Sequence, residues 1–140
     1  QNPLKIIEGA FDAVKKINDK GFLSVIVTNQ SAVAKGAVTI DKLERDHKKL
    51  EYLFGVQGSY FDRIYYCPYY PIKGFKGEIK KYKKKSLLRK PNNGMIIKAM
   101  RDFNINIKKS LLIGDQDVDR SVAIKSGIKY KILRFDSKLI

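Results

Sequence analysis

The chain has 140 residues, which is enough for one domain with a single buried core. Hydrophobic residues make up 44% and charged residues 31%, a composition typical of a globular protein and not of a disordered one. No apolar run approaches the roughly 18 residues that span a bilayer, and no signal peptide is visible. A single cysteine, Cys67, excludes an internal disulfide framework and indicates a reducing compartment. We therefore expect a cytoplasmic protein without a membrane partner.

The charge is strongly positive and unevenly distributed. Lysine and arginine total 29 against 14 acidic residues, a net charge of +15, and residues 73–90 contribute nine basic residues and one acid. Lysines outnumber arginines 23 to 6, which argues against dedicated recognition of phosphates and bases, since arginine is the better bidentate donor. We favour a solvated basic loop, and a nucleic-acid partner is the less favoured alternative.

Helical and strand-like patterns alternate along the chain. Helices are expected over residues 10–17, 39–54, 91–103 and 118–127, and strands over residues 22–27, 64–67, 110–114 and 128–133. In this interpretation Thr39 caps the second helix and Pro91 begins the third. Residues 68–90 form a basic excursion that is too long for a plain connection, so it should be functional or mobile. The pattern predicts an α/β fold, with one domain over residues 1–140.

An acidic pair follows the third expected strand, at the edge where α/β sheets bind ligands. Asp115 ends that strand, and Asp119 lies one helical turn further on if a helix starts there. Carboxylates at one rim make a hard, oxygen-rich site that suits Mg²⁺. Capping of the following helix by Asp115 or Asp117 explains the acids equally well, and the residues alone do not decide between the two interpretations.

Two further polar segments lie near expected strand or helix ends. Thr28, Asn29 and Gln30 follow the first strand and offer a hydroxyl, amides and backbone N–H groups to phosphate oxygens, although such residues are also ordinary turn chemistry. Lys90 precedes the expected helix start at Pro91, where anions gather and a lysine can neutralise a phosphoryl group. A plain surface lysine is the alternative.

Together these segments resemble the haloacid-dehalogenase (HAD) superfamily of aspartate-nucleophile phosphatases. The resemblance is sharpest to the D-glycero-D-manno-heptose 1,7-bisphosphate and histidinol-phosphate phosphatases of subfamily IIIA. It is carried by four segments: Val27-Thr28-Asn29-Gln30-Ser31-Ala32-Val33-Ala34-Lys35-Gly36, Ile64-Tyr65-Tyr66-Cys67-Pro68-Tyr69-Tyr70-Pro71, Arg89-Lys90-Pro91-Asn92-Asn93-Gly94-Met95 and Ile113-Gly114-Asp115. It implies a three-layer αβα sandwich with a parallel, Rossmann-like sheet.

The resemblance also implies a role for each matching residue. Lys90 and Thr28 would be catalytic, and Asp115, supported by Asp119, would hold Mg²⁺. The remaining implied substrate-binding residues, beside Thr28 and Lys90, are Asn29, Gln30, Ser31, Lys35 and Arg89. The implied reaction is hydrolysis of the phosphomonoester of a small phosphorylated sugar, through an aspartyl-phosphate.

Two departures from the family pattern stand out. Four soft ligands often hold zinc in such families, and the matching positions here are Cys67, Tyr69, Ser86 and Leu88, so we expect no zinc. The nucleophile of the family lies in an Asp-x-Asp-Gly pattern on the central strand, and the 140 residues contain no such pattern. We therefore expect an N-terminally incomplete domain that is inactive alone. A degenerate, non-catalytic module and a nucleic-acid-end phosphatase or binder are the alternative functions.

Overall fold

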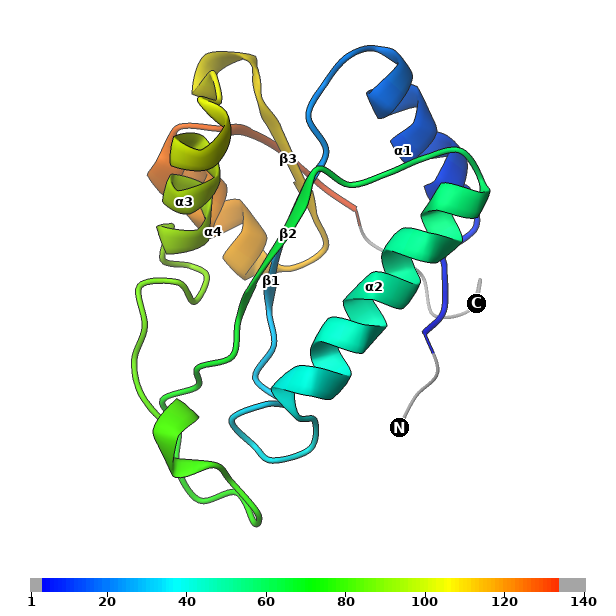
Figure 1. Cartoon of the computed structure of the whole chain (residues 1–140). Coiled ribbons are helices and arrows are strands. Elements are labelled where there is room, and N and C mark those ends of the chain that lie inside the picture. The colour runs from blue at the N-terminus through cyan, green and yellow to red at the C-terminus, as the bar shows by residue number, and fades with distance from the viewer. Residues whose placement is uncertain (1–3, 134–140) are drawn as a thin grey trace.

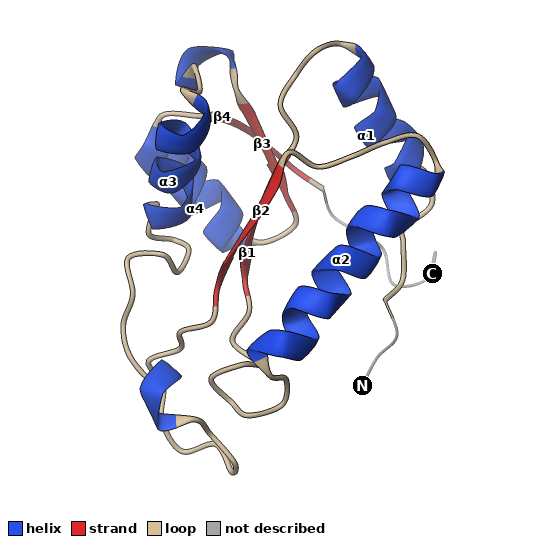
Figure 2. Cartoon of the chain, viewed as in Figure 1, coloured by secondary structure: helices blue, strands red, loops and turns tan. Residues whose placement is uncertain are grey.

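The computed structural model describes residues 4–133 of the chain. Helices and strands alternate throughout this range (Figures 1 and 2). The helices are α1 Ala10–Asp19, α2 Ile40–Val56, α3 Gly94–Phe103 and α4 Asp117–Ser126, and the strands are β1 Val25–Asn29, β2 Arg63–Cys67, β3 Leu111–Gly114 and β4 Lys129–Ile132. Single turns of 3-10 helix cover Lys80–Tyr82 and Ile107–Lys109. The predicted α/β alternation is confirmed.

The helices lie in two layers with the strands between them. Figure 1 shows α3 and α4 on one side of the strands and α1 and α2 on the other. Helix α3 contacts β1 and β2, and α4 contacts β3 and β4. The faces turned to the strands are apolar, with Met95 and Ala99 of α3 and Val122 of α4 buried. This is the expected three-layer αβα arrangement.

The described strands form two separate parallel pairs. Strand β1 pairs with β2 from Val25 opposite Arg63, and β3 pairs with β4 from Leu111 opposite Lys129. Alternate residues of β3 are exposed, with Leu111 at 57% and Ile113 at 51%. Strands of parallel sheets are normally covered on both faces. Within residues 4–133 one face of β3 is therefore left uncovered, and the strands do not form one continuous sheet.

The main hydrophobic core lies between the β1–β2 pair and α3. Tyr65, Cys67, Met95 and Ala99 form its buried centre, and partly buried side chains pack around them. These surrounding residues are Val25, Val27, Tyr69, Leu88, Phe103 and Ile105. The core thus joins the β1–β2 pair to α3 and to both ends of the 68–90 excursion.

Two elements begin three residues later than expected from the sequence, and the other boundaries differ by at most two residues. Strand β1 begins at Val25 and not at Phe22, because the N–H of Phe22 still closes onto the carbonyl of Ile17 at the end of α1. Helix α3 begins at Gly94 and not at Pro91, because turns in which Asn92 and Gly94 donate backbone hydrogen bonds occupy residues 87–94. The predicted Thr39 cap of α2 is confirmed, since its side chain accepts the N–H of Lys42 at 3.1 Å.

None of the helices in the described range is long and apolar enough to cross a membrane. The longest, α2, has 17 residues and carries many charged side chains.

Candidate active site

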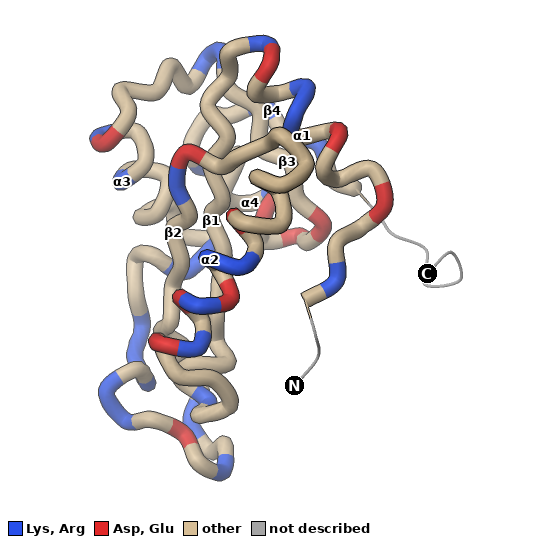
Figure 3. Tube along the Cα trace, turned by 45° about the vertical axis from the view of Figure 1, so that its right-hand side comes forward, with Lys and Arg blue, Asp and Glu red and all other residues tan. Residues whose placement is uncertain are grey.

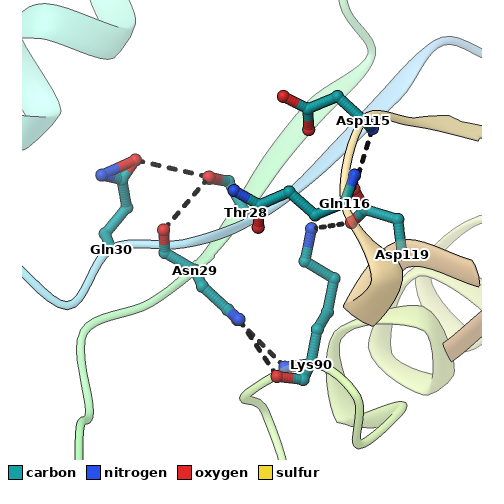
Figure 4. Close-up of polar contacts among 7 residues, drawn as sticks. All are labelled: Thr28, Asn29, Gln30, Lys90, Asp115, Gln116 and Asp119. Carbon is teal, nitrogen blue, oxygen red and sulfur yellow. Dashed lines mark hydrogen bonds and ion pairs between the residues drawn. The ribbon is translucent and has the colours of Figure 1, made fainter. Parts of the chain in front are cut away.

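Three segments meet where β1 and β3 end. They are residues 28–30 at the end of β1, the turn at Lys90, and residues 115–119, which run from the end of β3 into the first turn of α4. Figure 4 shows their side chains converging from these separate parts of the chain. The structure therefore brings together Thr28, Asn29, Lys90 and Asp119, as the sequence analysis predicts.

Asp119 is the most heavily bonded of these residues. One carboxylate oxygen, Oδ1, lies 2.5 Å from the ammonium of Lys90, and the other, Oδ2, accepts the backbone N–H groups of Asp115 and Gln116 at 3.1 Å. The two side chains of the ion pair are 12% (Lys90) and 7% (Asp119) exposed. Burial alone would raise the pKa of Asp119, but the hydrogen bonds from Lys90 and from the backbone outweigh it and lower the pKa below its ordinary value.

Gly114 permits this arrangement. A Cβ atom at position 114 would lie 2.4 Å from the side chain of Asp119. Any other residue would therefore push the carboxylate away from Lys90 and from the N–H groups it accepts. The glycine before Asp115 has a steric reason that the sequence pattern alone does not reveal.

Asn29 fixes the main chain of Lys90 from the other side. Its side-chain oxygen accepts the N–H of Lys90 at 3.0 Å, and its amide nitrogen donates to the carbonyl of Lys90 at 3.1 Å. The sequence analysis expects Asn29 to bind phosphate. In the structure the oxygen and one N–H of its amide bond to Lys90, and sequence reasoning missed this contact because the two residues are 61 positions apart.

Thr28 and Gln30 lie beside this bridge with looser contacts. The hydroxyl of Thr28 donates to the side-chain oxygen of Gln30 at 3.4 Å and to the carbonyl of Asn29 at 3.5 Å. Both distances are long for an O–H donor. The hydroxyl is therefore free to turn toward a better acceptor, such as a phosphate oxygen.

Asp115 presents its carboxylate differently from Asp119. The residue is exposed, and Figure 4 shows its carboxylate turned away from the ion pair of Lys90 and Asp119. No hydrogen bond to this carboxylate is found among residues 4–133, where no group of three or more His, Cys, Asp or Glu side chains is gathered for a metal either. One available carboxylate fits Mg²⁺, which is commonly bound by one or two carboxylates and keeps several waters.

Lys35 and Arg89 lie together at another point, on the ring of Tyr70. The Lys35 ammonium is 4.7 Å from the ring centroid and the Arg89 guanidinium is 4.6 Å away. The Nη1 atom of Arg89 is buried and has no hydrogen-bond partner in the described part of the chain. Ser31 belongs to the turn that carries Lys35, and its carbonyl accepts the N–H of that lysine. The structure thus places these predicted substrate-binding residues on the loops beside the Lys90 cluster.

The four positions at which related families often hold zinc are packed in another way. Cys67 is fully buried, and its thiol lies 3.9 Å from the carbonyl of Tyr69. Burial raises the pKa of this thiol. Tyr69 and Leu88 pack against the same core cluster as Cys67, so apolar contacts join these three positions.

The comparisons with known proteins agree on one family. A family model described as HAD-hydrolase-like matches residues 87–133. The D-glycero-beta-D-manno-heptose-1,7-bisphosphate 7-phosphatase of Haemophilus ducreyi is 37% identical over 97% of this chain and 72% of its own length. The D-glycero-alpha-D-manno-heptose-1,7-bisphosphate 7-phosphatase of Burkholderia mallei is 33% identical over 93% of this chain and 67% of its own length.

Solved structures show the same fold. The D,D-heptose 1,7-bisphosphate phosphatase from B. bronchiseptica, complexed with magnesium and phosphate, superposes with a TM-score of 0.77 at 24% identity. A HAD-like phosphatase from Mesorhizobium loti superposes with a TM-score of 0.79 at 23% identity. The similar region covers 90% and 89% of this chain, but only 64% and 57% of the two solved chains.

The ion pair of Lys90 and Asp119 leads to a prediction about stability and pH. Asp119→Asn should lower the free energy of unfolding by about 3 kcal/mol at pH 7, because it leaves the buried ammonium of Lys90 without its counter-charge. The pKa of Asp119 is lowered on folding, so this stabilisation is present above the unfolded value of about 3.9 and is lost as the pH falls through the folded value. Urea unfolding at pH 7 and near pH 2.5 measures both effects.

The matched control is Asp19→Asn, which breaks the exposed ion pair between Lys15 and Asp19. Its cost should be only about 0.5 kcal/mol. Equal losses for the two variants at pH 7, or a loss at Asp119 that does not change with pH, would contradict the buried ion pair.

The packing around Cys67 leads to a prediction about metal content. The purified protein should hold no stoichiometric zinc, because Tyr69, Ser86 and Leu88 stand where three thiolate or imidazole ligands would be needed. Elemental analysis after dialysis against a weak chelator tests this. One tightly bound zinc per chain would show that the prediction is wrong.

Proposed function

Because the chain belongs to the D-glycero-D-manno-heptose-1,7-bisphosphate 7-phosphatase family of HAD-like hydrolases, we propose that it supplies the phosphate- and metal-binding portion of a Mg²⁺-dependent phosphatase. The reaction is hydrolysis of a phosphomonoester, and the substrate is a phosphorylated sugar of the heptose bisphosphate type. This proposal rests on the position of Lys90. Its turn, which precedes α3, is held against the ends of β1 and β3.

Lys90 is prepared to neutralise phosphate charge. Its ammonium contacts Asp119, and its main chain is held by Asn29 on both the N–H and the carbonyl side. A donor fixed before the reaction stabilises developing charge without having to reorganise. The transfer of a phosphoryl group depends chiefly on positioning and electrostatic stabilisation. In this proposal Asn29 and Asp119 contribute by holding Lys90 in position.

Thr28 and Asp115 complete the proposed site. The loosely bonded hydroxyl of Thr28 would donate to an oxygen of the transferring phosphate. The exposed carboxylate of Asp115 would hold Mg²⁺, which when bound polarises phosphoryl oxygens. Asp119 supports this site by accepting the N–H of Asp115, which fixes where the main chain turns after β3.

The rest of the substrate would lie over the loops beyond Lys90. Gln30 and Ser31 follow β1 directly, and Lys35 and Arg89 present two cations at Tyr70. Neither cation forms an ion pair with a described carboxylate. Their charge therefore suits a substrate that carries more than one anionic group.

The attacking carboxylate is the missing component. Neither Asp117 nor Asp119 suits this role, because both lie in the first turn of α4 and Asp119 is already engaged with Lys90. In our proposal the nucleophile comes from an Asp-x-Asp-Gly strand that pairs between β1 and β3. The separation of the β1–β2 pair from the β3–β4 pair supports a strand at that place.

The metal assignment predicts the effect of one substitution. In a protein extended upstream to include an Asp-x-Asp-Gly strand, Asp115→Asn should abolish Mg²⁺-dependent release of phosphate and leave the fold intact, because an exposed carboxylate contributes little to packing. The measurement is phosphate release from a sugar bisphosphate, with circular dichroism to check folding. Asp12→Asn, an exposed acid in α1, is the control and should retain full activity. Near-normal turnover of the Asp115 variant would contradict the assignment.

The position of the nucleophile predicts a difference between two lengths of chain. Residues 1–140 alone should release no phosphate with Mg²⁺, because Lys90, Thr28 and Asp115 can hold a phosphate and a metal but cannot attack it. The extended chain should be active in the same assay. Equal, metal-dependent activity of both would place the nucleophile within the 140 residues and refute the proposed mechanism.

A further inference from the structure

One lysine of the basic excursion differs from its neighbours in burial. Six lysines between residues 73 and 85 are exposed, namely Lys73, Lys76, Lys80, Lys81, Lys84 and Lys85. Lys83, which lies among them in the sequence, is 8% exposed, and its side chain is 3% exposed. A charged lysine is almost never buried unless it is paired, so its surroundings require an explanation.

The ammonium of Lys83 contacts several parts of the excursion at once. It donates a hydrogen bond to the carbonyl of Ile72 and lies 3.5 Å from the carboxylate of Glu78. It also faces the rings of Tyr70 and Phe75, at 4.9 Å and 5.0 Å from their centroids. The carbonyl, the carboxylate and two aromatic faces are all groups that stabilise a cation.

Glu78 extends this arrangement into the loop tip. Its carboxylate accepts the N–H groups of Gly74 and Phe75 at 3.2 Å and 3.3 Å. The ammonium of Lys83 and the carboxylate of Glu78 thus close residues 70–83 around one charge pair. A solvated run of lysines would show no such closure.

The closed loop rests on the turn that carries Lys35. The N–H of Ile79 donates to the carbonyl of Ala34 at 2.9 Å, and a Cβ atom at Gly36 would lie 1.9 Å from the carbonyl oxygen of Gly77. The backbones of the loop and the turn are therefore in direct contact. Movement of the loop would displace the turn as well.

The ring of Tyr70 links Lys83 to the substrate-facing cations. Lys83, Lys35 and Arg89 all contact this ring, at 4.9 Å, 4.7 Å and 4.6 Å from its centroid. Lys83 alone among the three is paired with a described carboxylate. The contact with Lys83 thus fixes the ring of Tyr70 on the side of the loop. Lys35 and Arg89, which form no ion pair with a described carboxylate, contact the same ring.

We propose that Lys83 is a positioning residue, whose buried ammonium closes residues 70–83 and holds Tyr70 where it orients Lys35 and Arg89. The closure of the loop is argued from the contacts of Lys83 and Glu78 and does not depend on the proposed function. The consequence for substrate binding rests on the proposed function. Lys83 itself contacts no part of the proposed phosphate site.

The first test measures how accessible the ammonium is. A short pulse of acetic anhydride on the folded chain, read by mass spectrometry, should acetylate Lys83 at least about tenfold more slowly than Lys84 and Lys85, because an opening of the loop must precede the reaction. Labelling of Lys83 at the rate of its two neighbours would overturn the proposal.

The second test measures the closure of the loop. Lys83→Met keeps the length of the side chain and removes its charge, so hydrogen exchange at the amides of Gly74, Phe75 and Ile79 should accelerate by about tenfold or more. Lys83→Arg, which keeps the charge, should restore part of the protection, and Lys85→Met, the exposed control, should change nothing. Unchanged exchange in Lys83→Met would overturn the proposal. If that variant unfolds throughout, the amides of α4 will report it and the acetylation pulse decides.

The third test separates this inference from the proposed function. In the extended protein, Lys83→Met should raise KM for a sugar bisphosphate several-fold and change kcat little, because it disturbs Lys35 and Arg89 but not Lys90. Loss of loop protection without a change in KM would overturn the role in substrate binding and keep the closure. An extended protein without any phosphatase activity would overturn the proposed function alone.

Discussion

The ion pair between Lys90 and Asp119 is the contact on which the site depends. It joins the turn before α3 to the first turn of α4, and the bond from Asn29 to Lys90 continues the connection to β1. Three positions are constrained by it: a small residue at 114, an acid at 119 and an amide at 29. Since removing two charges from water costs much of what their attraction returns, the pair contributes more to the position of Lys90 than to net stability.

The same contact lies at the junction of the two strand pairs. The β1–β2 pair has its own core with α3, and the β3–β4 pair has its own contacts with α4. Among the described residues, side-chain hydrogen bonds that join the β1–β2 side to α4 are those of Lys90 with Asp119 and of Asn92 with Lys125. The geometry of the candidate site and the polar links between the two strand pairs therefore involve the same few groups.

Periodicity predicted the alternation of elements well, because apolar residues recur at strand or helix spacing, as in β1, β2 and α3, which form the main core. It failed where backbone hydrogen bonds decide, as at Phe22, which closes the end of α1, and at Pro91, which lies in a turn. The residues of the site were identified from strand ends and from the family resemblance. Their pairings were not, since the bonds of Asn29 to Lys90 and of Lys90 to Asp119 join positions 61 and 29 residues apart. The burial of Lys83 left no trace in the sequence, where it is one lysine among several.

The charges of the site fall into two groups with different consequences. Lys90 is balanced by Asp119, so its ammonium keeps a fixed position with its charge largely neutralised. Lys35 and Arg89 have no acidic partner in the part of the chain that the structure describes, and their contacts are with an aromatic ring. A ring attracts cations without neutralising them. Lys35 and Arg89 therefore keep their charge beside the candidate site, and the exposed lysines of residues 73–85 add further positive charge on the 68–90 excursion (Figure 3). A positive field of this kind favours the approach of an anionic ligand.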